Sequence, residues 1–461
     1  MVELTKRQKF LPILSNKGVD LKKEVLGGIT TFLTMAYIIA VNPSTLAGSG
    51  EAATGMPIGP LVTATCLAAA LGCILMGIFA NMPFALASGM GLNAFFAVTV
   101  VTNESITWEL ALTAVFLEGI IFILLSLFKV REAVVNAIPK NMKLAVTGGI
   151  GLFIAFIGLV NSGLVVSNPF TIVEMGHFSP SVIISLIGLV IIAVLDKKEV
   201  KGSILWGILT SSLLGWGYAL YDGAAAAALG IALPDGIFKF ESIAPIAGKI
   251  DFVHAFNPEV LGTFITLIFT FLFVDFFDTL GTLVGVCSRA KMLDENGNVP
   301  NAGRALLVDA VATTAGAALG VSTVTTYVES STGVAAGGRT GYTAITTGIL
   351  FLIAMFFSPI FVAIPSCATA PALIYVGYLM LGAVTEIDFH NITEGLPAFL
   401  TIAGMPLMYS IGDGLTIGIL SYTIINLLYN LISLKQKKGK VKVSWVMIVL
   451  SIIFTLKIIF L

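Results

Sequence analysis

The stretch that decides the fold is Phe269–Val286, FTFLFVDFFDTLGTLVGV. It is apolar enough to cross a membrane, yet it carries two carboxylates, Asp275 and Asp278, three residues apart. On a helix this spacing places both acids on one face. A charged side chain at the bilayer centre costs about 2.5–3.5 kcal/mol on insertion scales, so an intramembrane acid normally faces a cavity or a partner. The stretch therefore predicts a membrane helix that carries half of a binding site for a small polar solute.

The composition is that of a polytopic membrane protein. Of 461 residues, 57% are hydrophobic and only 11% are charged, whereas soluble domains carry about 25% charged residues. The four cysteines, Cys66, Cys73, Cys287 and Cys367, lie in or beside apolar segments without metal-ligand spacing. No phosphate loop, zinc spacing or Ser/His/Asp set lies in a suitable context. We therefore expect no catalytic residues, no metal, no cofactor and no nucleic-acid partner.

Fourteen apolar segments follow a basic tail, 1–23. They lie at about 24–42, 60–80, 84–101, 107–128, 143–160, 180–195, 203–221, 259–286, 302–320, 322–338, 340–362, 368–386, 395–410 and 412–434. With the N-terminus in the cytoplasm, 22 of the 25 Lys and Arg residues fall on the inner side, as expected for a multi-pass protein of the plasma or inner membrane. The long outer loop, 222–258, is expected to hold only short local structure. The sequence leaves open whether a last apolar stretch, 443–461, crosses the bilayer or lies along its inner surface.

Short matches between the two halves indicate an internal duplication. Ala137-Ile-Pro139 and Ala363-Ile-Pro365 each precede a long apolar segment, and Gly28-Ile-Thr-Thr-Phe resembles Gly262-Thr-Phe-Ile-Thr. An offset of seven spans is odd, so the two halves would have opposite orientations in the membrane. Inverted repeats of this kind are typical of secondary transporters.

Two segments at matching places in the halves are interrupted by small residues. They read FALASGMGLNAFF at 84–96 and STVTTYVESSTGVAAGG at 322–338. We expect each to begin extended and to continue as a half-helix, capped by Ser88 or by Ser330 to Thr332. The N-termini of half-helices provide N–H donors and a partial positive field in mid-membrane. Paired interrupted segments predict the binding site of a transporter.

Two carboxylates are the first candidates for contact with the solute. Asp278 lies on the opening stretch, and Glu329 comes directly before the second half-helix. An ionised carboxylate is an acceptor pair that suits two adjacent N–H donors. Two acids that face one small cavity disfavour double ionisation, so one of them can hold a proton and couple transport to a proton gradient. Alternatively, each acid bonds only backbone groups freed by the breaks. For Asp275 the sequence leaves two roles open: a residue of the site, or a structural partner of threonines in the first span.

Further candidates are polar or aromatic residues next to the breaks. The amide of Asn93 can donate and accept, which suits a carbonyl beside a ring nitrogen, and Tyr327 can stack on a planar ligand or bond to it. Phe95 and Phe277 can also stack, although a membrane phenylalanine usually only packs. We interpret three further intramembrane acids as structural residues that link one helix to another: Glu118, Asp309 and Asp413.

Three motifs resemble the nucleobase–cation symporter-2 superfamily, and within it the AzgA-like guanine/hypoxanthine/adenine permeases. They are Asp278-Thr-Leu-Gly-Thr282, Thr325-Thr-Tyr-Val-Glu-Ser-Ser-Thr-Gly333 and Gly89-Met-Gly-Leu-Asn-Ala-Phe95. The resemblance extends over about 19–434. It implies an all-α membrane fold of 14 segments in a 7+7 inverted repeat, with discontinuous segments 3 and 10. The implied parts are a core domain of 24–128 and 259–362, a gate domain of 129–221 and 363–434, and an additional stretch, 435–461.

The resemblance also implies proton symport of purine nucleobases, and often a homodimer formed through the gate domains. It implies that Asp278, Glu329 and Asn93 bind the base. The uracil-type branch has Glu at the position of Asp278 and His at the position of Thr282, so both positions favour a purine. Without that histidine, the proton carrier is Asp278, Glu329 or Asp275.

Guanine and hypoxanthine rank above adenine as substrates. Guanine presents N1–H beside its 2-amino group, which matches one carboxylate, whereas adenine reverses donor and acceptor at this edge. One alternative is a transporter of the same fold for uracil, xanthine or a small anion. A remote alternative is an intramembrane aspartyl protease that uses Asp222 and Asp413.

Overall fold

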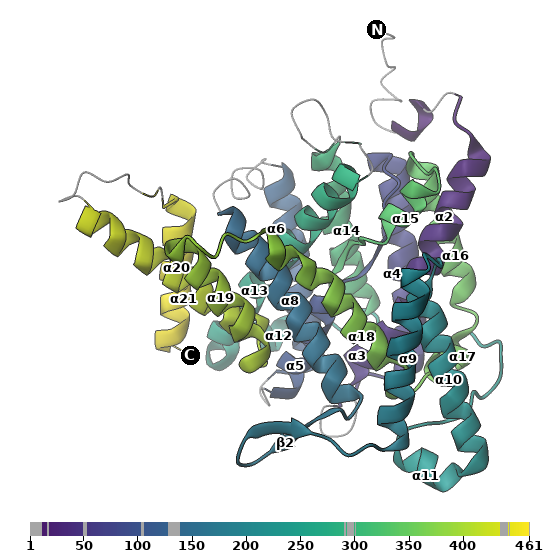
Figure 1. Ribbon diagram of the computed structural model, residues 1–461. Coiled ribbons are helices and arrows are strands. Elements are labelled where there is room, and N and C mark those ends of the chain that lie inside the picture. Colours follow the sequence, from purple (N-terminus) through teal and green to yellow (C-terminus); the bar gives the residue numbers. More distant parts are fainter. Residues whose placement is uncertain are drawn as a thin grey trace.

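The computed structural model of the protein describes residues 12–15, 18–48, 53–102, 106–127, 139–289, 292, 299, 301–433, 441 and 443–460. Within its helices, the side chains of 98–102, 127, 273, 276–278, 280–281, 284–286, 288–289, 433, 456–457 and 459–460 are outside this description. Helices dominate the described residues, and nine helical stretches among them are long and apolar enough to cross a membrane (Figure 1). This agrees with the predicted class of a helical multi-pass membrane protein.

Most helices follow the predicted apolar segments. They are α4 (Ile58–Leu75) with its π-helical continuation η3 (Met76–Ala80), α6 (Trp108–Leu127), α8 (Lys140–Asn161), α9 (Pro180–Lys197), α10 (Ser203–Tyr221), α13 (Pro258–Arg289), α14 (Ala302–Leu319), α18 (Ser366–Leu381) with η4 (Gly382–Glu386), α19 (Ile392–Leu407), α20 (Ile411–Ser433) and α21 (Trp445–Phe460). A short η1 (Pro12–Ser15) precedes them. Two predicted segments are divided: the first into α2 (Leu21–Met35) and α3 (Ile38–Ala47), and 340–362 into α16 (Gly341–Ala354) and α17 (Ser358–Val362).

Local sequence explains several helix ends. The Asp20 carboxylate accepts hydrogen bonds from the backbone N–H groups of Lys22 and Lys23 at the start of α2, and Ser179, followed by Pro180, caps α9, as expected for N-terminal residues of these types. Gly320 ends α14 in the left-handed conformation that favours glycine. Long-range contacts add a further cap, because the buried Glu24 of α2 accepts hydrogen bonds from the backbone of Arg339 and Thr340 ahead of α16.

The two interrupted segments are extended and then helical, as the sequence predicts. The first consists of β1 (Leu86–Ser88) and α5 (Met90–Thr102), and the second of β4 (Val324–Thr326) and α15 (Ser330–Ala335). The prediction that Ser330 to Thr332 would cap the second half-helix is wrong, because no side chain caps α15. The Ser330 hydroxyl instead accepts a hydrogen bond from the backbone N–H of Ala85, and therefore ties the two segments together.

The strands β1 and β4 pair antiparallel in the interior, with Ala87 opposite Thr325. The outer edges of such a pair present backbone groups that need partners wherever water is absent. On β1, the Cys73 thiol of α4 accepts from the N–H of Leu86 at 3.2 Å and donates to its carbonyl at 3.3 Å. On β4, the Thr313 hydroxyl of α14 bonds the N–H and carbonyl of Val324 at 3.1 and 3.0 Å. Both outer edges are thus closed by equivalent bonds from neighbouring helices.

The helices form two groups according to their contacts. The first contains α2 to α6 and α13 to α17, and the second contains α8, α9, α10, α18, α19 and α20. The groups meet where α8 lies against α5 and α13, where α18 lies against α3, and where α10 lies against α2. The paired strands lie within the first group, between α4, α13 and α14.

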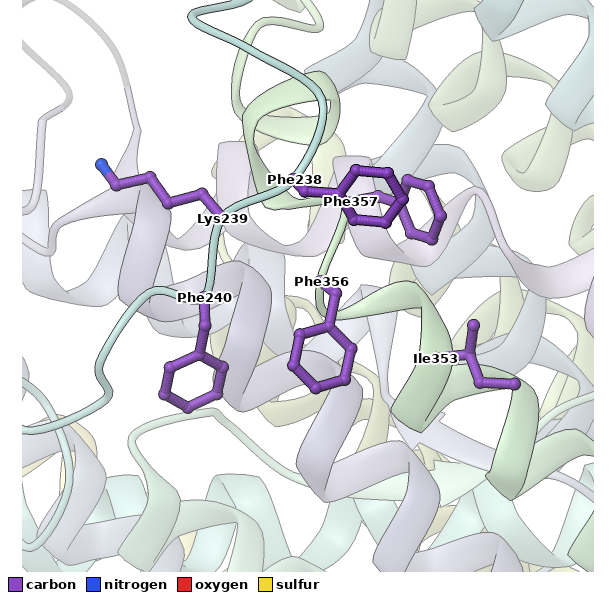
Figure 2. Close-up of a pocket in the computed structure, with 6 residues that line it drawn as sticks. All are labelled: Phe238, Lys239, Phe240, Ile353, Phe356 and Phe357. Atoms are coloured by element: carbon purple, nitrogen blue, oxygen red, sulfur yellow. The ribbon is translucent and has the colours of Figure 1, made fainter.

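The long loop 222–258 contains the short helices α11 (Gly223–Ala228) and α12 (Phe252–Ala255), as predicted. Its Lys239 is attached to the end of α16, because its N–H donates to the Phe356 carbonyl and its carbonyl accepts from Ser358. An open groove of about 390 Å³ lies here, lined by Phe238, Lys239, Phe240, Ile353, Phe356 and Phe357 (Figure 2). A hairpin of β2 (Val165–Asn168) and β3 (Ile172–Met175) between α8 and α9 was not predicted.

We expect Cys73→Ala to destabilise the protein by about 1–3 kcal/mol, because the substitution leaves the buried N–H and carbonyl of Leu86 without a partner. Cys73→Ser replaces the thiol by a hydroxyl that can make the same two bonds, so it should be closer to wild type. Cys66→Ala is the matched control, since Cys66 lies on the same helix, is equally buried and makes no hydrogen bond to a strand among the described residues. The thermal unfolding midpoint of the purified protein checks this. Equal midpoints for the two alanine variants would contradict the role of the thiol.

Candidate functional site

The candidate site lies where the two interrupted segments cross. Beyond the β1–β4 pairing, the N–H of Gly89 donates to the Thr323 carbonyl and the N–H of Tyr327 donates to the Ala85 carbonyl. The half-helices α5 and α15 begin on either side of this pair. Helix α13, which carries the opening stretch of the sequence, packs against α5, β4 and α15. The three elements predicted to form the site are therefore neighbours.

Asn93 joins the two interrupted segments and retains a free donor. Its Oδ1 accepts from the hydroxyl of Ser88 at 2.8 Å and from that of Ser322 at 2.7 Å. The side chain is 1% exposed, and its Nδ2 has no hydrogen-bond partner among the described residues. Leaving a buried donor unsatisfied is costly. The amide is thus fixed in orientation, and its NH2 group is left as a donor without a partner among the described residues.

Tyr327 has a structural role in addition to the predicted contact with a ligand. Its hydroxyl donates to the Ser88 carbonyl at 2.5 Å, and the side chain is buried. This bond satisfies a further carbonyl on the outer edge of β1. The hydroxyl therefore helps to hold the break in place, while stacking of the ring on a ligand stays a prediction.

Glu329 is held by a residue that the sequence analysis missed. The hydroxyl of Tyr37 donates to its Oε1 at 2.6 Å, and Tyr37 lies at the break between α2 and α3, 1% exposed. A tyrosine inside an apolar segment usually needs a partner for its hydroxyl, and this is the one sequence signal that could have identified it. Glu329 itself is partly buried and precedes the first residue of α15.

Close backbone packing positions this acid. A Cβ on Gly333 of α15 would lie 2.0 Å from the Thr31 hydroxyl oxygen and 2.6 Å from the Gly27 carbonyl oxygen, so only glycine permits this approach of α15 to α2. The hydroxyls of Thr34 and Thr332 lie 3.0 Å apart across the same contact. The start of α15, and with it Glu329, is thereby fixed against the first span.

The α13 residues are described to different extents. Asp275 is fully buried and Thr282 is 6% exposed. The side chains of Phe277 and Asp278 lie outside the described residues, so their predicted contacts stay predictions. Thr279 donates to the Asp309 carboxylate of α14 at 3.0 Å, which agrees with the interpretation of Asp309 as a tie between helices.

Phe95 packs against α13. Its ring is edge-on to that of Phe271, with centroids 5.0 Å apart, and the side chain is 6% exposed. Contact with a ligand would therefore be limited to the remaining ring surface. The open groove of Figure 2 contains none of the predicted site residues. Within the described part of the chain, no group of three His, Cys, Asp or Glu side chains could hold a metal ion.

Comparison with known proteins identifies the family. Residues 22–419 match the model of the Permease family, Xan_ur_permease. The chain belongs to this permease family. The protein is thus an integral membrane permease and not an enzyme, which excludes the protease alternative; Asp222 instead caps α11 by accepting from the N–H of Ala225.

Curated permeases resemble the chain over nearly its full length. It is 44% identical to the guanine/hypoxanthine permease PbuG of Bacillus subtilis, covering 96% of this chain and 98% of that protein. It is 39% identical to the adenine permease AdeP of Escherichia coli, covering 97% and 95%. Among solved structures, the transmembrane domain of the cyanobacterial bicarbonate transporter BicA shares the fold, with a TM-score of 0.65 at 15% identity, covering 87% of this chain and 97% of that one.

We expect Tyr37→Phe to weaken transport by the permease. A hydrogen bond to a charged group contributes about 1.5–3 kcal/mol, so the solute concentration for half-maximal uptake should rise roughly tenfold. Tyr422→Phe, at an equally buried tyrosine of α20, is the control. Concentration-dependent uptake at equal amounts of folded protein checks this. Identical uptake curves for wild type and Tyr37→Phe would contradict a role for the Tyr37–Glu329 bond.

Proposed function

We propose that the permease imports purine nucleobases, guanine and hypoxanthine in preference to adenine, by proton symport. The observation that carries the proposal is the crossing of the interrupted segments. The first segment carries the fixed Asn93 amide, whose Nδ2 has no hydrogen-bond partner among the described residues, and the second carries the Glu329 carboxylate. A flat heterocycle with adjacent donors and acceptors complements such a set. The names of the relatives, a guanine/hypoxanthine permease and an adenine permease, support the purine class.

The proposed contacts follow from the donors and acceptors of each side chain. Asp278, as an acceptor pair, takes the N1–H and 2-amino group of guanine. The Nδ2 of Asn93 donates to a ring nitrogen or carbonyl oxygen, and Glu329 accepts from a ring N–H. Tyr327, Phe95 and Phe277 enclose the ring faces, and Thr282 occupies the place of the histidine found in the uracil-type branch.

The proposed coupling uses an acid of the same site. Asp278, Glu329 and Asp275 are the carriers considered, since two carboxylates near one small cavity favour uptake of a proton by one of them. The hydrogen bond from Tyr37 to Glu329 links the first span to one of these candidate carriers. Binding of a neutral base and binding of a proton then become linked equilibria.

The finer architecture is proposed as well: 14 spans in a 7+7 inverted repeat, with a core domain of 24–128 and 259–362 and a gate domain of 129–221 and 363–434. The equivalent edge bonds of Cys73 and Thr313 support an inverted duplication, and the two contact groups of helices support the division into domains. Movement of the core against the gate would expose the site alternately to each side. We further propose a homodimer in the plasma or inner membrane, with a cytoplasmic N-terminus.

The substrate class is tested by competition uptake in cells. Labelled guanine should be displaced by hypoxanthine and guanine, more weakly by adenine, and not by uracil or a small anion. A protonophore should reduce uptake, Asp278→Asn should abolish it because one acceptor becomes a donor, and Glu329→Gln should weaken binding or its pH dependence. Displacement by uracil alone, or full uptake by Asp278→Asn, would contradict the proposal.

Substitutions of Asn93 distinguish the role of its side-chain oxygen from that of its side-chain nitrogen. Asn93→Asp keeps the acceptor for Ser88 and Ser322 but removes the Nδ2 donor, so the fold should persist while uptake falls about tenfold or more. Asn93→Ala removes both functions and should also lower the thermal midpoint. Measuring uptake and the midpoint for both variants checks this. Normal uptake by Asn93→Asp would show that the donor has no role in binding.

A further inference from the structure

The C-terminal helix α21 lies outside the region matched by the family model, which ends at residue 419. Polar side chains attach α21, and Val441 ahead of it, to α20. The side-chain amide of Asn430 bonds both the N–H and the carbonyl of Val441, at 2.9 and 2.7 Å. The hydroxyl of Ser451 donates to that of Thr423 at 2.6 Å.

The remaining bonds establish the direction of α21. The Thr423 hydroxyl donates to the Met447 carbonyl at 3.4 Å, and the Ser451 hydroxyl lies 3.5 Å from the Ile419 carbonyl. Each step along α21 towards its C-terminus therefore matches a step along α20 towards its N-terminus. From residue 430 back to residue 419, the contact follows α20 for about 16 Å, at 1.5 Å per residue. The two helices form an antiparallel hairpin (Figure 1).

The surface of α21 fits hydrocarbon and not the membrane surface. One stripe, Val446, Met447, Leu450 and Phe454, is buried, and α21 also contacts α13. The opposite face exposes Trp445, Val449 and Ile452, and Ile458 is exposed near the C-terminal end. The exposed Thr455 donates its hydroxyl to the Ser451 carbonyl of the same helix. A helix that lies along the interface needs a strongly polar face, which this exposed stripe does not provide. The 16 residues of α21 extend about 24 Å, most of the hydrocarbon thickness of about 30 Å, and a short span is accommodated at modest cost.

We propose that α21 crosses the bilayer antiparallel to α20, as a span additional to the two repeats. The basic stretch 434–442 and the C-terminal end of α21 then lie on opposite sides of the membrane. In Figure 1 the C-terminal end of α21 accordingly points away from the side of the N-terminus. That this end emerges on the outer side rests on the orientation given under the proposed function, whereas the crossing itself does not.

Disulfide trapping tests the packing. In a chain with a protease site inserted at 434–440, the pair Thr423→Cys and Ser451→Cys should cross-link on oxidation, so the two fragments stay joined. The control pair, Thr423→Cys and Ile452→Cys, places the second thiol on the exposed face and should not cross-link. The native cysteines are all buried, so their background is low. Absence of a cross-link in the first pair, or equal cross-linking in both, would overturn the hairpin.

Labelling with a membrane-impermeant maleimide tests the crossing. Gly439→Cys should react in inverted vesicles, and a Gly-Ser-Cys extension after Leu461 should react in intact cells, because the two positions lie on opposite sides. Reaction of both from the same side would overturn the proposal. Reaction of Gly439→Cys from outside would retain the crossing and reverse only the orientation of the chain. Purine uptake by the unlabelled variants distinguishes these outcomes from failure of the proposed function.

Discussion

The constraint on which the structure depends is the hydrogen bonding of backbone that is not helical at membrane depth. Without water, each unpaired N–H or carbonyl is costly. Here two three-residue strands pair with each other, and side chains from neighbouring helices close the outer edges: Cys73, Thr313 and Tyr327. Because these bonds are directional, the crossing is rigid, and it is a suitable support for a site that must discriminate between flat polar solutes.

The same bonds explain why the site combines order with an unsatisfied group. Ser88 and Ser322 use the carbonyl of Asn93 to lock the two segments together, which leaves its amino group without a partner in the described residues. Tyr37 fixes Glu329, and the contact between Gly333 and α2 fixes the helix behind it. Side chains thus bond the backbone at the outer edges of both strands, while the Asn93 amide retains polar capacity where a ligand would bind.

The arrangement of helices gives these local bonds a context. The strands lie within one group of helices, and α8 of the other group approaches α5 and α13 beside them. A shift of one group against the other would change the walls of the site without breaking the strand pairing. The hairpin of α20 and α21 adds a helix next to α13, so the additional C-terminal span would form part of the lipid-facing cover of the helix that carries Asp275 and Asp278.

The amino-acid sequence by itself determined the class of the protein, the course of most helices and the two interrupted segments, because apolar runs of membrane length and clusters of glycine, serine and threonine are local signals. It also singled out Asn93 and Glu329 as candidates, since polar residues in apolar segments are conspicuous, and their role in binding stays a prediction. It missed Tyr37, the break at Ala36, the β2–β3 hairpin and the true partner of Ser330. The partners of Tyr37 and Ser330 lie hundreds of positions away, since Tyr37 contacts Glu329 and Ser330 contacts Ala85, whereas the β2–β3 hairpin pairs residues that are close in the sequence. Only the packed tertiary structure decides which polar atoms find each other and which stay free.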